Sequence, residues 1–312
     1  MKLYTWRGGT PNFGDELNAL LWPALLPRFF DEDDTEIVLG IGSVLDRRHA
    51  PDQLKVVLGA GYGGYQAPPQ IDRSWVVHWV RGPLTARFLG LDPAVGLGDP
   101  AMLWPVTADA SALAKDLAET PAGGGIGFMP HFESLGRGAW AGAAEAAGLR
   151  LIDPRADPLD ILAKIAGCRL LISEAMHGAI IADTLRVPWV AVEPLAAIHR
   201  AKWRDWAGAL NLTIRFQNLP PSSLREWVSV SPLAALRPIG RGVQLAGRWL
   251  DYVGSRPLLD RAAGALRRLA AEPGQLSELT SLQRCQERML SRLDAVRRHP
   301  REAGRSVSAG CA

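Results

Sequence analysis

The stretch that decides the fold reads Leu170-Leu171-Ile172-Ser173-Glu174-Ala175-Met176-His177-Gly178-Ala179-Ile180-Ile181-Ala182. An apolar run of strand length passes through a short polar turn into small and aliphatic residues, which is typical of a buried parallel strand followed by a helix. Ligands of parallel sheets bind beyond the carboxyl ends of the strands, where helices begin. Glu174 and His177 fall in this turn, and a carboxylate three residues from an imidazole suits general acid–base chemistry. A purely structural Glu–His hydrogen bond is the alternative.

The same alternation of apolar runs and helical patterns extends in both directions from this stretch. Runs rich in Val, Ile and Leu with little polar alternation predict parallel strands that are covered on both faces. The expected strands are Lys2–Trp6, Glu36–Ile41, Lys55–Gly59, Trp75–Val80, Val95–Gly98, Ile126–Met129, Arg150–Asp153, Leu170–Ser173, Trp189–Val192 and Thr213–Phe216. Two βαβ series in succession predict an α/β protein with two Rossmann-like, doubly wound domains.

Changes in composition divide the 312 residues into three ranges. The run Thr120-Pro121-Ala122-Gly123-Gly124-Gly125 is typical of a hinge. We therefore expect an N-terminal domain at 1–118, a second domain at 119–239, and a helical extension with a basic tail at 240–312. Apolar residues at helical spacing in the extension favour a helix packed on the protein, with a basic face against an anionic membrane as the alternative. These residues are Leu276, Leu279, Leu282, Met289, Leu293 and Val296.

Charge and cysteine content exclude several classes of protein. The net charge is +3, but residues 256–305 hold 11 arginines against 6 acidic residues, so the remainder carries about −2. A nucleic-acid binder is not expected from that balance. The three cysteines form no CxxC pair, which indicates reduced thiols in the cytosol. The first residues lack the apolar core of a signal peptide and no run is long enough to span a membrane, so we expect a cytoplasmic protein.

Two loops of the first half carry glycines beside polar residues. Asn12-Phe13-Gly14-Asp15 follows the first expected strand, and Asp15 can cap a helix or meet a ligand. The run Gly59-Ala60-Gly61-Tyr62-Gly63-Gly64 resembles a dinucleotide fingerprint, but Pro68 and Pro69 follow where a helix should start. We therefore exclude a nicotinamide or flavin site there. A loop in which a tyrosine stacks on a sugar is the better interpretation.

Arg81 stands at the end of an expected buried strand, just before a helix start at Pro83. A buried arginine needs an anionic partner, because an unpaired buried charge is costly. That partner is either the phosphate or carboxylate of a ligand, or a structural aspartate such as Asp99 at the end of another strand.

Further candidates lie in the second half. His131 follows the first strand there, where a ligand would bind. Arg200 and Lys202 are closely spaced cations that suit a phosphate, and an ordinary solvated helix face is the alternative. No histidines and cysteines have zinc-ligand spacing, so no metal site is expected.

Taken in order, several segments resemble the polysaccharide pyruvyl transferase family. They are Asn12-Phe13-Gly14-Asp15, Gly40-Ile41-Gly42-Ser43, Arg81-Gly82-Pro83-Leu84, Asp99-Pro100-Ala101, Pro130-His131, Ser173 through Ala182, Val187-Pro188 and Lys202, within about residues 1–215. The opening Tyr4-Thr5-Trp6-Arg7 is most similar to the ketal-forming branch of succinoglycan synthesis. The resemblance implies a GT-B-like fold, phosphoenolpyruvate as the donor with no other cofactor, a hexose acceptor, and functional roles for His177 and Arg81. The family commonly has Arg-Leu-His where this chain has Ala175-Met176-His177.

With this resemblance we expect the following roles. His177 is the general acid and base, oriented or assisted by Glu174. Arg81, Lys202 and Arg200 bind the donor, while Asp15, Asn12 and His131 contact the acceptor and Asp99 is structural. A lipid-linked acceptor would place the protein at the inner face of the cytoplasmic membrane, with peripheral contact through the basic C-terminal helices.

Two other functions remain open from the sequence. A nucleotide-sugar glycosyltransferase of the same fold class would use an acidic residue such as Glu193 to bind ribose. A non-catalytic component of a polysaccharide assembly complex would rely on the basic C-terminal helices.

Overall fold

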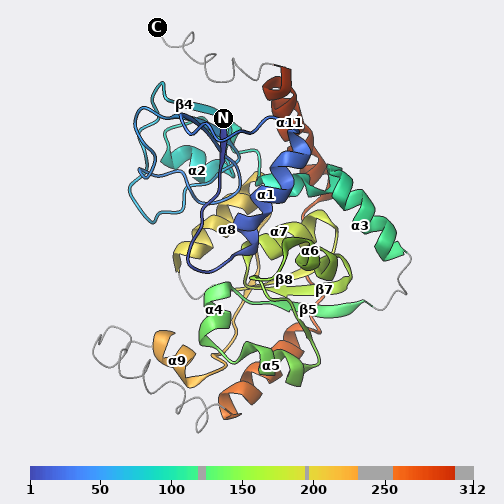
Figure 1. Cartoon of the computed structure of the whole chain (residues 1–312). Helices are drawn as coiled ribbons and strands as arrows, with labels where there is room; N and C mark the ends of the chain where they lie inside the picture. Colours follow the sequence, from blue (N-terminus) through green and yellow to red (C-terminus); the bar gives the residue numbers. More distant parts are fainter. Residues whose placement is uncertain (119–123, 194–196, 231–255, 299–312) are drawn as a thin grey trace. The chain divides into compact units, whose positions relative to one another are not determined.

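The computed structural model describes residues 1–118, 124–193, 197–230 and 256–298. It contains two parallel sheets with helices packed on them, which confirms the predicted α/β class (Figure 1). The chain forms two compact units: the first comprises Met1–Thr120, Ala196–Ile214 and Ser277–Ala312, and the second comprises Pro121–Leu195 and Arg215–Leu276. Each unit is described by itself below.

The first unit is built on a sheet of four parallel strands whose spatial order follows the sequence. Its strands are β1 (Lys2–Tyr4), β2 (Glu36–Leu39), β3 (Leu54–Leu58) and β4 (Trp75–Trp79). Aliphatic side chains of these strands, including Ile37, Leu39 and Val57, are buried in one apolar cluster. Burial of Val, Ile and Leu on a parallel sheet is the main stabilising contribution, at roughly 25 cal/mol per Å² of apolar area.

The first sheet differs from the doubly wound prediction in two ways. Its order does not reverse, and the described connections 40–53 and 59–74 are loops without a helix. Parallel strands need a crossover of a dozen or more residues, and an extended loop of that length can provide one. The expected strand at Val95–Gly98 is only an isolated bridge between Val80 and Gly96.

Helices complete the first unit. They are α1 (Phe13–Leu25), α2 (Pro83–Phe88), the 3-10 turns η1 (Pro93–Val95) and η2 (Pro100–Val106), α3 (Ala108–Ala118), α8 (Ala197–Ala209) and α11 (Leu279–Arg298). On α11, Leu282, Met289 and Leu293 are buried, so the expected packing of this apolar stripe on the protein is confirmed. Leu279, by contrast, is 49% exposed.

The second unit contains five parallel strands in the order β6-β5-β7-β8-β9. They are β5 (Gly125–Met129), β6 (Arg150–Leu151), β7 (Cys168–Ser173), β8 (Trp189–Val192) and β9 (Phe216–Gln217). The order reverses at β5, because β6 lies on one side of it and β7 on the other. In an open parallel sheet, the crevice beyond the carboxyl ends of the two strands at such a reversal is the preferred ligand site.

The helices of the second unit are α4 (Phe132–Arg137), α5 (Trp140–Ala147), α6 (Pro158–Ala166), α7 (Met176–Thr184), α9 (Leu224–Val230) and a helix at residues 256–269. Ala262 and Leu266 of the last helix are buried in one apolar cluster with Phe128 and Ile172 of the sheet. None of the helices in the described ranges combines the length and hydropathy that crossing a membrane requires.

The two units do not follow the ranges 1–118, 119–239 and 240–312 expected from the sequence. Helix α8 falls within the range of the second expected domain, yet it belongs to the first unit. The expected C-terminal extension is divided, because residues 256–269 belong to the second unit and α11 belongs to the first. The chain therefore passes between the units several times.

Candidate active site

The reversal point of the second sheet brings together three residues singled out in the sequence. His131 follows β5 by two positions, and Glu174 follows β7 directly. His177 lies in the first turn of α7, which starts two residues after Glu174. Three groups that can move or hold a proton therefore surround the carboxyl ends of two neighbouring strands.

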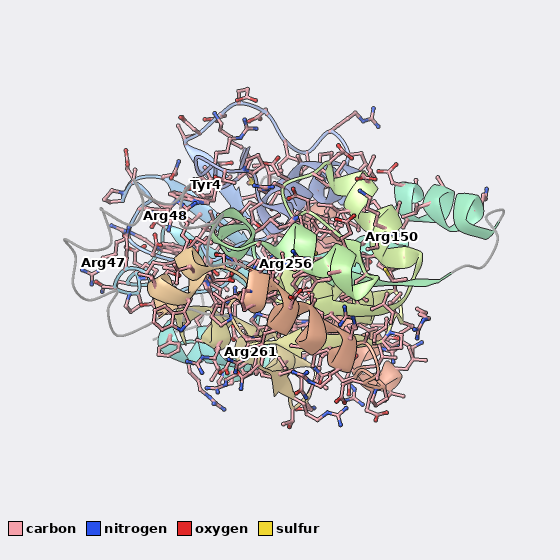
Figure 2. All side chains as sticks on the ribbon, turned by 90° about the horizontal axis from the view of Figure 1, so that it is seen from below. Tyr4, Arg47, Arg48, Arg150, Arg256 and Arg261 are labelled. Atoms are coloured by element: carbon pink, nitrogen blue, oxygen red, sulfur yellow. The ribbon has the colours of Figure 1, made fainter. Side chains whose placement is uncertain are left out.

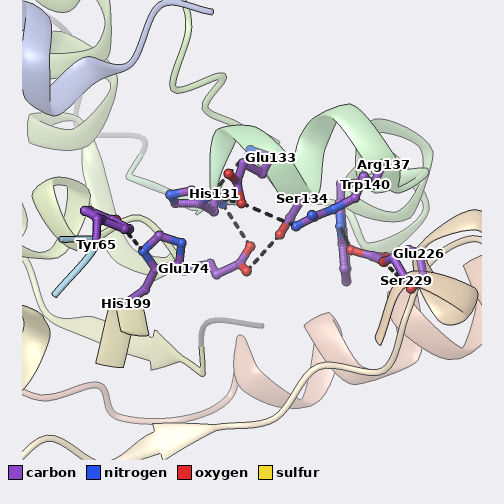
Figure 3. Close-up of polar contacts among 10 residues, drawn as sticks. All are labelled: Tyr65, His131, Glu133, Ser134, Arg137, Trp140, Glu174, His199, Glu226 and Ser229. Atoms are coloured by element: carbon purple, nitrogen blue, oxygen red, sulfur yellow. Dashed lines mark hydrogen bonds and ion pairs between the residues drawn. The ribbon is translucent and has the colours of Figure 1, made fainter. Parts of the chain in front are cut away.

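Glu174 is the structural centre of this group. Its side chain is buried, with 6% exposure. The carboxylate oxygen Oε2 accepts a hydrogen bond from the backbone N–H of His131 at 2.9 Å, and Oε1 accepts one from the hydroxyl of Ser134 at 2.9 Å (Figure 3). These bonds satisfy a carboxylate that would be costly to bury alone. Glu174 thus fixes the loop that carries His131 and the start of α4.

His131 is also the N-cap of α4. Its ring nitrogen Nδ1 accepts a hydrogen bond from the backbone N–H of Glu133 at 3.4 Å, and it lies 3.8 Å from a carboxylate oxygen of the same residue. His131 therefore holds the start of α4 through its own side chain.

His177 is held by close packing at the start of α7. A Cβ atom on its neighbour Gly178 would lie 2.6 Å from Sδ of Met129 and 2.7 Å from Oγ of Ser173, so only glycine permits this approach. The Ser173 hydroxyl also donates to the carbonyl of Ala175, the N-cap residue, at 2.7 Å. The imidazole is half-buried and lies at the positive end of the helix dipole, which favours a bound anion.

In the first unit, Asn12 and Asp15 meet at the start of α1. The Asn12 amide donates to Oδ2 of Asp15 at 2.9 Å, and the backbone N–H of Asp15 donates to the Asn12 carbonyl at 2.9 Å. Asp15 also faces the loop after β2, because a Cβ on Gly42 would lie 3.5 Å from its Oδ1. These two expected acceptor residues therefore form one polar pair at the carboxyl edge of the first sheet.

Asn18 is a residue whose role sequence reasoning missed. It is fully buried, its amide donates to the Ile41 carbonyl at 3.0 Å, and its Oδ1 accepts from the Ile41 N–H at 2.8 Å and from Nε1 of Trp22 at 3.1 Å. These bonds tie α1 to the loop after β2. The sequence does contain a sign of this role, because Asn18 is an amide among the buried apolar residues Leu17 and Leu21 of α1.

Arg81 is buried, with 1% exposure, and all three guanidinium nitrogens donate to protein groups. Nε donates to Oδ2 of Asp205 at 3.0 Å, Nη1 to the Ser43 hydroxyl at 2.9 Å and Nη2 to the Tyr62 carbonyl at 3.1 Å. The sequence left the partner open between a ligand anion and a structural aspartate such as Asp99; the structure pairs Arg81 with the aspartate Asp205, while Asp99 caps η2 through the Ala101 N–H at 3.0 Å. The geometry thus supports Arg81 as a residue that orders the surrounding loops.

Asp205 links α8 to the start of α2. Besides Arg81, it accepts hydrogen bonds from the Thr85 N–H at 2.9 Å and from the Thr85 hydroxyl at 2.5 Å. A Cβ on Gly82 would lie 1.9 Å from the Asp205 carbonyl oxygen, so the helix packs directly on the backbone there. Sequence reasoning assigned no role to Asp205, which lies among the cations of this segment.

With α8 anchored in this way, its Lys202 and His199 contact Tyr65 of the loop after β3. The Lys202 amine donates to the Tyr65 hydroxyl and lies 4.4 Å from the ring centroid. The same hydroxyl lies 3.3 Å from Nδ1 of His199 (Figure 3). Tyr65 is 48% exposed, and Arg200 lies on the same helix. The expected cations therefore accompany a phenol and an imidazole within the first unit.

Comparison of the sequence with known proteins identifies the family of this chain. Residues 12–194 match the family model described as polysaccharide pyruvyl transferase. A curated relative is "Succinoglycan biosynthesis protein ExoV" of Rhizobium meliloti (strain 1021), which is 39% identical over 228 residues, or 72% of this chain and 70% of the relative. No solved structure matches the chain.

Proposed function

This chain belongs to the polysaccharide pyruvyl transferase family, and we propose that it transfers pyruvate from phosphoenolpyruvate to a hexose of an exopolysaccharide or of its lipid-linked precursor. The products are a pyruvate ketal and inorganic phosphate. The observation that carries the proposal is the gathering of His131, Glu174 and His177 at the carboxyl ends of β5 and β7, where a parallel sheet binds ligands.

The proposed reaction moves two protons and needs no redox step. The methylene carbon C3 of the donor takes a proton, which leaves an oxocarbenium-like centre at C2. One sugar hydroxyl adds to C2 and gives up its proton, and the C2–O bond to phosphate breaks with its electron pair on the phosphate. A second hydroxyl adds and closes the ketal. The two hydroxyl protons are therefore balanced by one in the new methyl group and one on the phosphate.

His177 is assigned as the acid that protonates C3 and as the base that accepts a hydroxyl proton. An imidazole suits both steps because its ordinary pKa lies near neutrality. Glu174 acts through its hydrogen bonds to His131 and Ser134, so we assign it as a positioning residue. His131 is assigned to the acceptor hydroxyls.

The donor's anionic groups require cations. Lys202 and Arg200 of α8 are assigned to the phosphate and carboxylate, because Arg81 is already engaged by Asp205, Ser43 and Tyr62. Ala175, in the place of the arginine common in the family, is 7% exposed at the N-cap of α7. In this proposal the positive charge for the donor comes from the cations of α8.

Asn12 and Asp15 are assigned to the acceptor sugar, since a carboxylate and an amide together can accept from and donate to vicinal hydroxyls. The proposal places the enzyme in the cytoplasm, with a lipid-linked acceptor at the inner face of the membrane. Arginines of the C-terminal helices would then contact anionic headgroups.

The test is to incubate the purified protein with phosphoenolpyruvate and a panel of methyl hexosides, and to measure phosphate release and product mass. We expect phosphate release that depends on the acceptor, together with a ketal product. A glycosyltransferase would instead be protected against thermal unfolding by a sugar nucleotide and not by phosphoenolpyruvate. Release of no phosphate with any acceptor would contradict the proposal.

A further inference from the structure

Trp6 is an exposed indole of the first unit, at the edge of the sheet where Asn12 and Asp15 also lie. It follows β1 by two positions, so it lies at the carboxyl edge of the first sheet, and its side chain is 48% exposed. Exposure of so large an apolar ring forfeits part of the hydrophobic stabilisation that burial would give. Contacts other than burial in the core must therefore fix the orientation of the Trp6 ring.

Arg48 holds the ring from one side. Its guanidinium carbon lies 4.5 Å from the Trp6 ring centroid, which is a cation–π contact. The guanidinium is fixed in turn by two bonds to Asp46, Nε to Oδ1 at 2.6 Å and Nη2 to Oδ2 at 2.5 Å. Asp46 is only 3% exposed. Arg48 is labelled in Figure 2, which draws all described side chains as sticks.

The guanidinium lies over the indole, and 48% of Trp6 is nevertheless exposed. A ring that is already oriented loses little conformational entropy when a ligand stacks on it. The same loop after β2 that carries Arg48 also carries Gly42, which faces Asp15. The open ring and the polar pair of Asn12 and Asp15 are therefore attached to one stretch of structure at the same edge of the sheet.

We propose that Trp6, held by Arg48, is a stacking subsite for a pyranose ring of the acceptor saccharide. The inference rests on the proposed function and specifies the class of saccharide that serves as the acceptor. A pyranose with equatorial hydroxyls presents only axial C–H bonds on each face, which pack on an indole, while its rim hydroxyls remain available to polar residues. The subsite thus selects β-linked, gluco-type residues next to the sugar that is modified.

The test measures saccharide binding without phosphoenolpyruvate, so that it does not depend on turnover. Cellotetraose is titrated into the wild-type chain, Trp6→Ala and Trp6→Phe, and the dissociation constant is followed by calorimetry. Trp227→Ala is the matched control, because Trp227 is 43% exposed and belongs to α9 of the second unit. Thermal unfolding of each variant confirms that it is folded.

We expect Trp6→Ala to weaken binding by about tenfold or more, Trp6→Phe to retain most of it, and Trp227→Ala to match the wild type. The affinity of Arg48→Ala for cellotetraose should lie between those of the wild type and Trp6→Ala, because the Trp6 ring remains but Arg48 no longer orients it. Equal binding by wild type and Trp6→Ala, or no binding of cellotetraose by the wild type, would overturn the subsite. Binding through Trp6 without phosphate release from phosphoenolpyruvate would keep the subsite and refute the proposed reaction.

Discussion

Arg81, just beyond the end of β4, and Asp205, on α8, form a buried ion pair across 124 residues of sequence, with Nε and Oδ2 3.0 Å apart. Both side chains are at most 3% exposed. Because α8 carries Lys202 and Arg200, this pair helps to fix the helix on which the cations assigned to the donor lie. The pair therefore holds in place a helix whose residues the proposal assigns to the donor.

Replacing one partner of this pair should be far more costly than replacing both. Arg81→Met leaves the Asp205 carboxylate buried without its charge partner, and we expect a loss of about 3–5 kcal/mol in the free energy of unfolding. The double variant Arg81→Met/Asp205→Leu should recover part of that loss. Urea unfolding measures the stability of the two single variants and of the double variant, and a double variant whose loss equals or exceeds the sum of the two single losses would contradict the pairing.

The hydrogen bonds of Glu174 predict that Glu174→Gln lowers stability and kcat more than Ser134→Ala does. In Glu174→Gln the amide oxygen can still accept from the His131 N–H, and the amide N–H₂ then faces the Ser134 hydroxyl, so the charge-assisted bond that the hydroxyl donates is lost. We expect a loss of about 1–3 kcal/mol in stability together with a lower kcat, since the loop carrying His131 loosens. Ser134→Ala removes one bond and should have the smaller effect. A Gln variant with wild-type kcat would show that Glu174 does not position the site.

His78 predicts a dependence of stability on pH. Burial, with a contribution from Arg292, lowers the pKa of His78 from 6.5 to about 4, and among the described residues its Nε2 has no hydrogen-bond partner. A lowered histidine pKa adds stability above pH 6.5 that is lost as the pH falls toward 4, because the unfolded chain takes up the proton first. The loss should amount to at most about 3 kcal/mol. Comparing urea unfolding of wild type and His78→Leu at pH 7 and pH 4.5 should show a smaller pH effect in the variant.

Chelation should leave the activity unchanged. The residues assigned to the donor are cations, Lys202 and Arg200, which supply charge that a divalent ion would otherwise provide. After dialysis against EDTA, phosphate release with an acceptor should equal that of the untreated protein. Activity that returned only on addition of a divalent ion would refute this prediction.

The second sheet could be predicted closely because its information is local. The run Leu170–Ser173 is apolar and continues through Glu174 into a helix within a dozen residues. The expected edge strand Thr213–Phe216 was less accurate, because β9 is Phe216–Gln217. The positions of His131 and His177 beside strand ends followed from that pattern. The contacts of Glu174 did not, because they depend on how α4 turns back toward β7.

The first unit was harder to predict because its decisive contacts are non-local. Asp99 is 18 positions from Arg81 and follows a strand-like run, whereas the true partner Asp205 comes from a helix far along the chain. No local sequence pattern indicates that α8 belongs to the first unit while the segments before and after it belong to the second. The loops that connect β2 to β3 and β3 to β4 are long enough to join parallel strands, but they have no helical periodicity. The order of the strands therefore could not be inferred from the sequence.

The central claim is that pyruvate moves from phosphoenolpyruvate with a proton delivered to C3 by His177. The direct measurement is the reaction in D₂O with an acceptor hexoside, followed by mass spectrometry and NMR of the product. We predict one deuterium in the methyl group of the ketal, and a fall of about 10²–10⁴ in kcat for His177→Ala with wild-type stability. A product that retains its methylene group, or a His177→Ala variant with full turnover, would contradict the account.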